Sequence, residues 1–169
     1  RIKLKQNRYP QGIPRTFQTS LQQSKGDFIF LADQDDLWLP DKREVMMRHL
    51  QTADLVISDC KLVDHVLKSK HESFYSFNNS GKGILRNLVR NSYMGCCMAF
   101  RRSVLERALP FPNDIPLHDY WIGLVAEFYF KVKFIPDVLI YHRRHAANAS
   151  TTGEISRQSF SRKMMNRYR

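Results

Sequence analysis

Short apolar runs recur along the chain, and amphipathic or polar segments of helical length separate them. The run at 28–32 is continuous and strand-sized, as in a central strand that is covered on both faces. Further runs of this kind lie at 55–58, 96–100, 131–135 and 138–142. Strands that alternate with helices predict an α/β fold, a three-layer α/β/α sandwich around a mostly parallel sheet.

The intervening segments predict the helices. They are expected over 16–25, from Pro40 onward, over 84–90, from Ser103 onward and over 119–128. Ser103 and Glu106 have the spacing of a capping box, which marks the start of a helix. By contrast, the stretch 61–83 is polar and irregular, and it is expected to form a long loop.

Three carboxylates follow the first predicted strand within four residues, at Asp33, Asp35 and Asp36. Ligand sites in α/β sheets lie beyond the carboxyl ends of the strands, so this loop is the first candidate site. Like charges this close repel one another unless water or a cation lies between them, and carboxylate oxygens suit Mg²⁺ or Mn²⁺. Asp33 and Asp35 point the same way in an extended segment, whereas Asp36 points elsewhere and is a candidate cap for the next helix. The alternative is a solvated turn that ends the strand.

The net charge of the chain gives a second indication of the kind of partner it binds. Its 169 residues are the size of one domain and carry 27 Lys and Arg against 16 Asp and Glu, a formal net charge of +11. Such a surface favours anionic partners such as nucleic acid, acidic lipid or phosphorylated small molecules. None of the apolar runs reaches the ~18 residues of a membrane-spanning helix. The cysteines, Cys60, Cys96 and Cys97, match no zinc-ligand spacing and are expected to be reduced and buried.

The segment 26–42 reads GDFIFLADQDDLWLPDK. Its D-Q-D-D-x-W-x-P-D-K pattern resembles the central motif of family 2 glycosyltransferases with the GT-A fold, in the bacterial branch called rhamnosyltransferase-like. Three later segments resemble further motifs of this family in the same order: 91–102 an acceptor-side strand, 118–121 the acidic start of a helix, and 141–150 the closing Arg/His segment. The resemblance spans 7–150.

The family's N-terminal strands, which hold the nucleoside, have no counterpart in this sequence. The resemblance therefore implies that 1–152 is the C-terminal portion of a GT-A domain, and that 153–169 is a basic C-terminal tail, expected to be helical. The Lys and Arg residues of this tail suit contact with an acidic membrane surface, and a solvated helix is the alternative.

The resemblance implies an inverting, metal-dependent transfer of a sugar from a nucleoside-diphosphate sugar to a hydroxyl of a glycan or lipid-linked acceptor, in bacterial surface polysaccharide synthesis. It implies Mn²⁺ or Mg²⁺ held by Asp33, Asp35 and His145. Asp119 is the implied catalytic proton acceptor, with a helix N-cap as its alternative role. The donor is expected to contact Asp33, Asp35, Asp36, Arg15 and Arg144. The acceptor is expected to contact Trp38, Tyr93, Met94, Gly95, His118 and Trp121, for which ordinary packing is the alternative.

Two other functions stay open at this point. A catalytically silent fragment or interaction module would keep these motifs without the nucleoside-binding strands. The basic charge also suits a nucleic-acid-binding domain, but the Lys and Arg residues are scattered and the sharpest cluster is acidic, so no nucleic acid is expected as a partner. The sequence shows no signal peptide, and the expected location is the cytoplasm, with peripheral contact at the inner face of the cell membrane.

Overall fold

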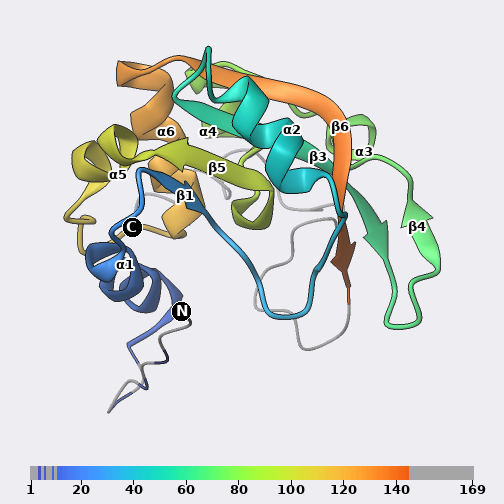
Figure 1. The fold of residues 1–169 in the computed structure, drawn as a ribbon, viewed down its shortest axis with the longest axis horizontal. Helices are drawn as coiled ribbons and strands as arrows, with labels where there is room; N and C mark the ends of the chain where they lie inside the picture. Colours follow the sequence, from blue (N-terminus) through green and yellow to red (C-terminus); the bar gives the residue numbers. More distant parts are fainter. Residues whose placement is uncertain (1–3, 5, 7–8, 10, 145–169) are drawn as a thin grey trace.

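A twisted mixed sheet forms the centre of the molecule (Figure 1). The computed structural model describes residues 4, 6, 9 and 11–144. Across the sheet the strands are β1 (Phe28–Phe30), β5 (Met98–Arg101), β3 (Leu55–Val63), β6 (Val132–Arg143) and β2 (Leu37–Trp38), and β4 (Ser69–His71) pairs with β3 as a hairpin. The predicted α/β class is confirmed, since helices and strands alternate along most of the described chain.

The expectation of a mostly parallel sheet is corrected by the strand directions. β3 and β6 pair in parallel, whereas β5 runs antiparallel to both of its neighbours, β1 and β3. β2 and β4 also pair antiparallel. A continuous apolar run indicates that a strand is covered on both faces, but it carries no information about the direction of that strand.

Helices cover both faces of the sheet, as the three-layer prediction requires (Figure 1). They are α1 (Ile13–Gln23), α2 (Lys42–His49), α3 (Phe74–Asn78), α4 (Ile84–Val89), α5 (Arg102–Ala108) and α6 (His118–Tyr129), with a 3-10 turn, η1, at Gly95–Cys97. Alternate residues of β3 serve the two cores: Leu55 and Ile57 face the larger one, and Val56 faces the smaller one under α2.

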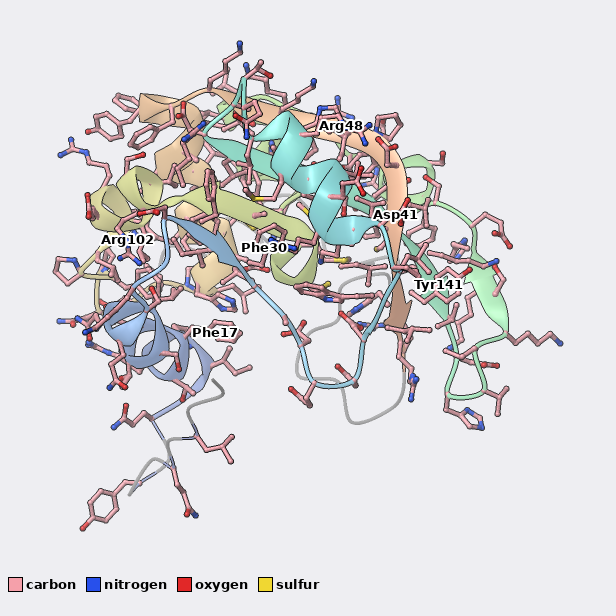
Figure 2. The ribbon with its side chains drawn as sticks, viewed as in Figure 1. Phe17, Phe30, Asp41, Arg48, Arg102 and Tyr141 are labelled. Carbon is pink, nitrogen blue, oxygen red and sulfur yellow. The ribbon has the colours of Figure 1, made fainter. Side chains whose placement is uncertain are left out.

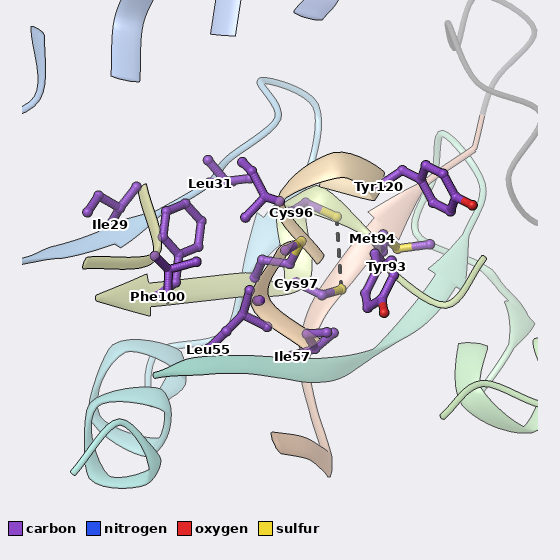
Figure 3. Packing of buried hydrophobic residues seen from close by; sticks show 14 of the residues in the cluster. Ile29, Leu31, Leu55, Ile57, Tyr93, Met94, Cys96, Cys97, Phe100 and Tyr120 are labelled. Carbon is purple, nitrogen blue, oxygen red and sulfur yellow. Dashed lines mark hydrogen bonds between the residues drawn. The ribbon is translucent and has the colours of Figure 1, made fainter. Parts of the chain in front are cut away.

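The larger core joins β1, β3 and β5 to α5 and α6. Figure 3 shows Leu55 and Phe100 on the same side as Ile29, and Cys96 and Cys97 between them and Tyr93. These side chains are nearly inaccessible to solvent, and burying a Leu or Phe side chain stabilises a fold by roughly 1.5–3 kcal/mol. The cysteine thiols belong to this core as small apolar groups, as the sequence predicted.

Three sequence expectations about elements are wrong. The region 61–83 contains the end of β3, β4 and α3, because Phe74 inserts into the core and anchors that helix. The two strands expected at 131–135 and 138–142 are the single strand β6, whose register shifts beside Pro136, a residue with no amide hydrogen for the ladder. The capping box at Ser103 does not form, since α5 begins one residue earlier, without a side-chain cap.

The helices of the described part of the chain are too short and too polar for any of them to cross a membrane. The basic tail at 153–169 lies outside the described residues.

Candidate functional site

The carboxyl ends of three strands meet at one edge of the sheet. β1 and β3 both run antiparallel to β5, and β3 runs parallel to β6, so these three strands end on the same side. The loop 33–36 follows β1 at this edge, and the end of β6 brings His142 and Arg143 to it (Figure 1). Segments that lie more than 100 residues apart in the sequence therefore meet at the position expected for a ligand.

Asp36 joins this loop to the end of β6. Its Oδ1 accepts a hydrogen bond from His142 Nδ1 at 2.9 Å and another from the backbone amide of Arg143 at 3.1 Å. Cys96 lies behind the pair, with its Sγ 3.8 Å from His142 Nδ1. Asp36 does not cap the following helix, since Asp41 is the N-cap residue of α2. The carboxylate that follows Asp35 thus positions the acidic loop against β6.

Electrostatics reinforce this contact. Burial alone would raise the pKa of Asp36, but the hydrogen bond from His142 and the attraction of its ring outweigh burial and lower that pKa. Burial likewise opposes the charged form of His142, yet the bond to Asp36 raises its pKa above the usual value. Each partner therefore stabilises the charged form of the other in a partly buried setting.

Asp33 lies in an environment that suits a cation. Burial and the nearby carboxylates of Asp36 and Asp35 raise its pKa, and the attraction of His142 opposes this only in part. A divalent cation beside these carboxylates would offset both burial and repulsion. Asp33 and Asp35 offer carboxylate oxygens, the ligand type that Mg²⁺ and Mn²⁺ prefer, so these residues fit such an ion by their chemistry. Among the described residues, the group whose ligand atoms lie within 4.8 Å of one another is instead Asp36, Cys96 and His142.

Asp119 lies in the first turn of α6 and is fixed by two backbone amides. Its Oδ2 accepts from the amide of Gly95 at 2.9 Å, and its Oδ1 accepts from the amide of Tyr120 at 2.7 Å. Burial raises the pKa of Asp119 to about 6 despite these bonds, and the charge of Asp33 adds to the shift. The residue after Gly95 is Cys96, which lies against His142, the partner of Asp36, so the start of α6 lies near the end of β6 and the acidic loop. The N-cap position itself is Leu117, so Asp119 is not the cap.

Gly95 allows the backbone to approach Asp119 closely. A Cβ at this position would lie 3.3 Å from Asp119 Oδ2 and 3.4 Å from His118 Nε2, which is tighter than ordinary packing. Glycine therefore permits the short bond between its amide and the carboxylate. The Gly95 amide is the contact that connects η1 to the start of α6.

His118 lies beside Asp119 and is held by stacking. Its ring packs on Phe17 of α1, with centroids 3.6 Å apart and planes 12° from parallel. Burial lowers the pKa of His118 to about 4, so the ring is neutral at pH 7. Neither ring nitrogen has a hydrogen-bond partner among the described residues.

Lys42 is a site residue that the sequence reasoning missed. Its side chain is fully buried, and its Nζ donates to the carbonyl of Cys96 at 2.6 Å. The same ammonium lies 3.9 Å from the ring centroid of Trp38, which is 37% exposed. Burial lowers the pKa of Lys42, partly offset by the nearby thiols and Asp36. The Trp-x-x-x-Lys spacing within the acidic motif was a signal for this contact.

Other predicted residues lie in settings of several kinds. Arg15 is exposed on α1 and donates to Asn113 Oδ1 at 2.6 Å. Tyr93 and Met94 are buried in the larger core, which favours the packing alternative for their side chains (Figure 3). Trp121 donates from its indole nitrogen to the carbonyl of Ala108 at 2.9 Å and so ties α6 to α5.

The end of β6 carries the remaining predicted residues. Arg144 is partly buried at this end, and its amide donates to the carbonyl of Val63. His145 lies outside the described residues. The sequence analysis assigned no role to His142. The alternation of side chains along a strand was the available signal, because it directs His142 to the face opposite that of its neighbour Arg143. Figure 2 shows the loop after Phe30 approaching the strand that carries Tyr141.

The fold resembles that of S. aureus TarS 1–349 in complex with UDP-GlcNAc. The TM-score is 0.63 over 90% of this chain and 45% of that chain, and the sequences are 15% identical, so the likeness concerns the fold alone. With an acidic loop at the carboxyl ends of its strands, the molecule falls in the class of GT-A-type α/β domains.

The sequence profile of Glycosyl transferase family 2 matches residues 1–109, more than half of the chain, and the protein belongs to this family. It is 26% identical over 160 residues to the uncharacterized glycosyltransferase alr2836 of Nostoc sp., covering 85% of this chain and 49% of that protein. It is also 26% identical over 127 residues to WfgD of Escherichia coli, a UDP-Glc:alpha-D-GlcNAc-diphosphoundecaprenol beta-1,3-glucosyltransferase, covering 73% of this chain and 47% of that protein.

The chain spans about half the length of the curated relatives it matches. The family predicted from the motifs is confirmed. The residues matched by the family profile include the acidic loop and Gly95 but end before Asp119, so the role of Asp119 rests on its geometry and on the resemblance of its motif.

Proposed function

We propose that this chain forms the diphosphate-binding and acceptor-binding part of an inverting, metal-dependent glycosyltransferase, which moves a sugar from a nucleoside diphosphate to an acceptor hydroxyl. The observation that carries the proposal is a chain of contacts from the acidic loop to the start of α6. Asp36 of the loop bonds to His142, and Cys96 lies against the same His142. The amide of Gly95, the residue before Cys96, bonds to Asp119. A donor held at the acidic loop and an acceptor held near Asp119 would be brought together for transfer.

On the donor side, Asp33 and Asp35 would hold Mn²⁺ or Mg²⁺, with His145 completing the ligand set. The ion would neutralise the charge that develops on the departing diphosphate. Asp36 keeps the loop against β6 through His142 and the Arg143 amide, so that the two metal-binding carboxylates are presented from a fixed backbone. Arg144 and Arg15 are proposed to contact the diphosphate oxygens, which suit the planar guanidinium group.

On the acceptor side, Asp119 would take the proton of the attacking hydroxyl. A pKa of about 6 leaves this carboxylate ionised at neutral pH and places its basicity near the working pH. The amides of Gly95 and Tyr120 hold it in one orientation, and the neutral ring of His118 offers a hydrogen-bonding group beside it. Attack from this side opposite the departing diphosphate would invert the anomeric carbon.

The substrates are proposed by analogy with the relatives. TarS was crystallised with UDP-GlcNAc, and the name of WfgD specifies a UDP-sugar donor and a diphosphoundecaprenol-linked acceptor. A UDP-sugar and a lipid-linked glycan acceptor in bacterial surface polysaccharide synthesis, at the cytoplasmic face of the membrane, are therefore proposed here. The rhamnosyltransferase-like form of the acidic motif makes dTDP-rhamnose the competing donor.

Calorimetry of the intact protein with Mn²⁺ and UDP, dTDP or GDP tests the donor site. We expect metal-dependent binding of one nucleotide, and we expect Asp35→Ala to abolish it and to lower turnover by roughly a thousandfold or more, because the metal stabilises the leaving group by several kcal/mol. Asp41→Ala is the matched control, since Asp41 is an exposed acid a few residues away that makes no side-chain capping bond.

The outcome distinguishes the two hypotheses left open by the sequence. Heat with one nucleotide that Asp35→Ala removes supports the enzyme. No heat with any of the three nucleotides in the presence of Mn²⁺ would instead identify a silent interaction module.

A further inference from the structure

The turn between β3 and β4 presents apolar side chains to solvent. Val66 is 66% exposed and Leu67 is 41% exposed, although β3 itself is almost entirely buried. Figure 1 shows the hairpin projecting from the body of the molecule beyond the ends of its neighbouring strands. Two neighbouring apolar side chains at the tip of a projecting hairpin have no packing role within the described chain.

The turn is nevertheless built to hold these side chains in place. Asp64 Oδ1 accepts from the amides of Val66 and Lys68 at 3.0 and 2.9 Å, and the Asp64 amide donates to the carbonyl of Lys68 at 3.0 Å. Leu67 adopts a φ of +63°, a region that disfavours a residue with a Cβ. Glycine would be the unstrained choice at this position, whereas this chain has leucine there at the cost of backbone strain.

The charges around this tip are basic. Lys68 and Lys70 are exposed and follow the apolar pair, and His65 and His71 are exposed beside them. The carboxylate of Asp64 is directed to the turn amides, and Glu72 is paired with Lys61 at 2.7 Å. An apolar tip surrounded by lysines matches the boundary between anionic lipid headgroups and acyl chains.

The position of the hairpin relates it to the candidate site. β3 ends at the same edge of the sheet as β1 and β6, so the hairpin projects from the side that carries the acidic loop (Figure 1). We propose that the tip of the β3–β4 hairpin, residues 64–70, inserts Val66 and Leu67 into an anionic lipid bilayer, with Lys68 of the turn and Lys70 of β4 at the headgroups. The value of this orientation rests on the proposed function, because it would hold the site toward a lipid-linked acceptor.

A second exposed apolar group, at the end of α6, can be compared with the hairpin tip as a membrane-docking surface. Phe128 and Tyr129 are 70% and 52% exposed at the end of α6, which leads into the first residues of β6. They lie at the opposite edge of the sheet, since Val132 pairs with Leu55, the first residue of β3. Docking through this group would turn the candidate site away from the bilayer.

Co-sedimentation with vesicles tests the proposal directly. The intact protein is mixed with phosphatidylcholine vesicles, or with phosphatidylcholine vesicles that contain phosphatidylglycerol, and the partition coefficient is measured. We expect binding to the anionic vesicles alone. The double variant Lys68→Gln, Lys70→Gln should lower the partition coefficient roughly 10- to 30-fold, since each basic residue near an anionic surface contributes about fivefold.

The apolar tip is tested separately. Val66→Ser with Leu67→Gly removes both apolar side chains, and glycine tolerates the backbone of position 67, so the fold should be retained or slightly stabilised. This variant should lower the partition coefficient several-fold. Phe128→Ser is the control of similar exposure and should leave the coefficient unchanged.

Every protein in the series carries the same basic tail, so differences between variants report the hairpin alone. Equal binding by the hairpin variants and the unaltered protein, or loss of binding only in Phe128→Ser, would overturn the proposal. Nucleotide binding with Mn²⁺ is measured on the same samples. A hairpin variant that loses lipid binding but keeps nucleotide binding separates the failure of one proposal from the failure of the other.

Discussion

Asp36 and Asp119 are aspartates of the same candidate site whose pKa values are shifted in opposite directions. Asp36 pairs with His142 and the Arg143 amide, and its pKa is lowered. Asp119 receives two amide hydrogen bonds but no positive side chain, and its pKa is raised to about 6. A charged partner thus decides whether a buried carboxylate is a stable anion or a potential base.

The difference matches the two proposed tasks. A residue that fixes the position of a metal-binding loop should stay ionised and paired under all working conditions. A residue that accepts a proton should be ionised but only weakly stabilised as an anion. The environments of the two residues therefore support different proposed roles, and each role can be tested independently.

The largest expected effect follows from Asp119→Asn. Asparagine keeps the size of the side chain but removes its basicity, so turnover should fall roughly 10²- to 10⁴-fold while nucleotide binding is retained. In the unaltered protein, turnover at low substrate should fall about tenfold per pH unit below about 6, as Asp119 becomes protonated. Both are measured by steady-state transfer assays between pH 5 and 8.

Asp114→Asn serves as the control for this experiment, because Asp114 is an exposed acid in the segment before α6. Transfer by Asp119→Asn at the rate of the unaltered protein would show that another group accepts the proton.

A smaller effect, on stability, is expected from Asp36→Ala. The Arg143 amide and the buried His142 ring both lose their acceptor, so the free energy of unfolding should fall by about 1–3 kcal/mol. Asp36 has a lowered pKa and His142 a raised one, so both charges coexist between those pKa values. The loss should therefore shrink as the pH rises through the raised pKa of His142.

Urea unfolding of the variant and the unaltered protein measures this difference. Asp41→Ala is the control: Asp41 is an exposed acid between β2 and α2 that makes no side-chain capping bond, so its loss should change the free energy of unfolding by less than about 1 kcal/mol. An equally small change in Asp36→Ala would mean that the contact with β6 does not position the loop.

The smallest expected effect is an increase in the free energy of unfolding, in the variant Asp119→Asn. Because the folded-state pKa of Asp119 is raised, its contribution to stability is present in acid and is lost as the pH rises through about 6. Asp119→Asn should therefore raise the free energy of unfolding at pH 8 by about 1 kcal/mol, after allowance for the loss of one amide hydrogen bond, because asparagine has one acceptor oxygen for the two amides. Urea unfolding at pH 8 and pH 4 should show the gain at the higher pH only. A variant that is less stable than the unaltered protein at pH 8 would contradict the burial of an unpaired charge.

Much of this site could be located from the sequence. The acidic loop was predicted because a continuous apolar run, followed at once by three carboxylates, is a local pattern. Lys42 was missed because lysine is ordinarily exposed, and its burial depends on the Cys96 carbonyl and the Trp38 ring that meet it. Tyr93 was expected to face an acceptor, but its ring packs against Gly123 of α6 in the core.

The sequence by itself determined the α/β class, the glycosyltransferase family 2 motifs and the acidic loop after β1, because these depend on apolar periodicity and on neighbouring residues. Only the tertiary structure decided that β5 runs against its neighbours, that Asp36 bonds to a histidine 106 residues away, and that the Gly95 amide holds Asp119. Strand direction, side-chain pairing between strands and the pKa values that follow from it arise from contacts between distant segments, and no local pattern encodes such contacts.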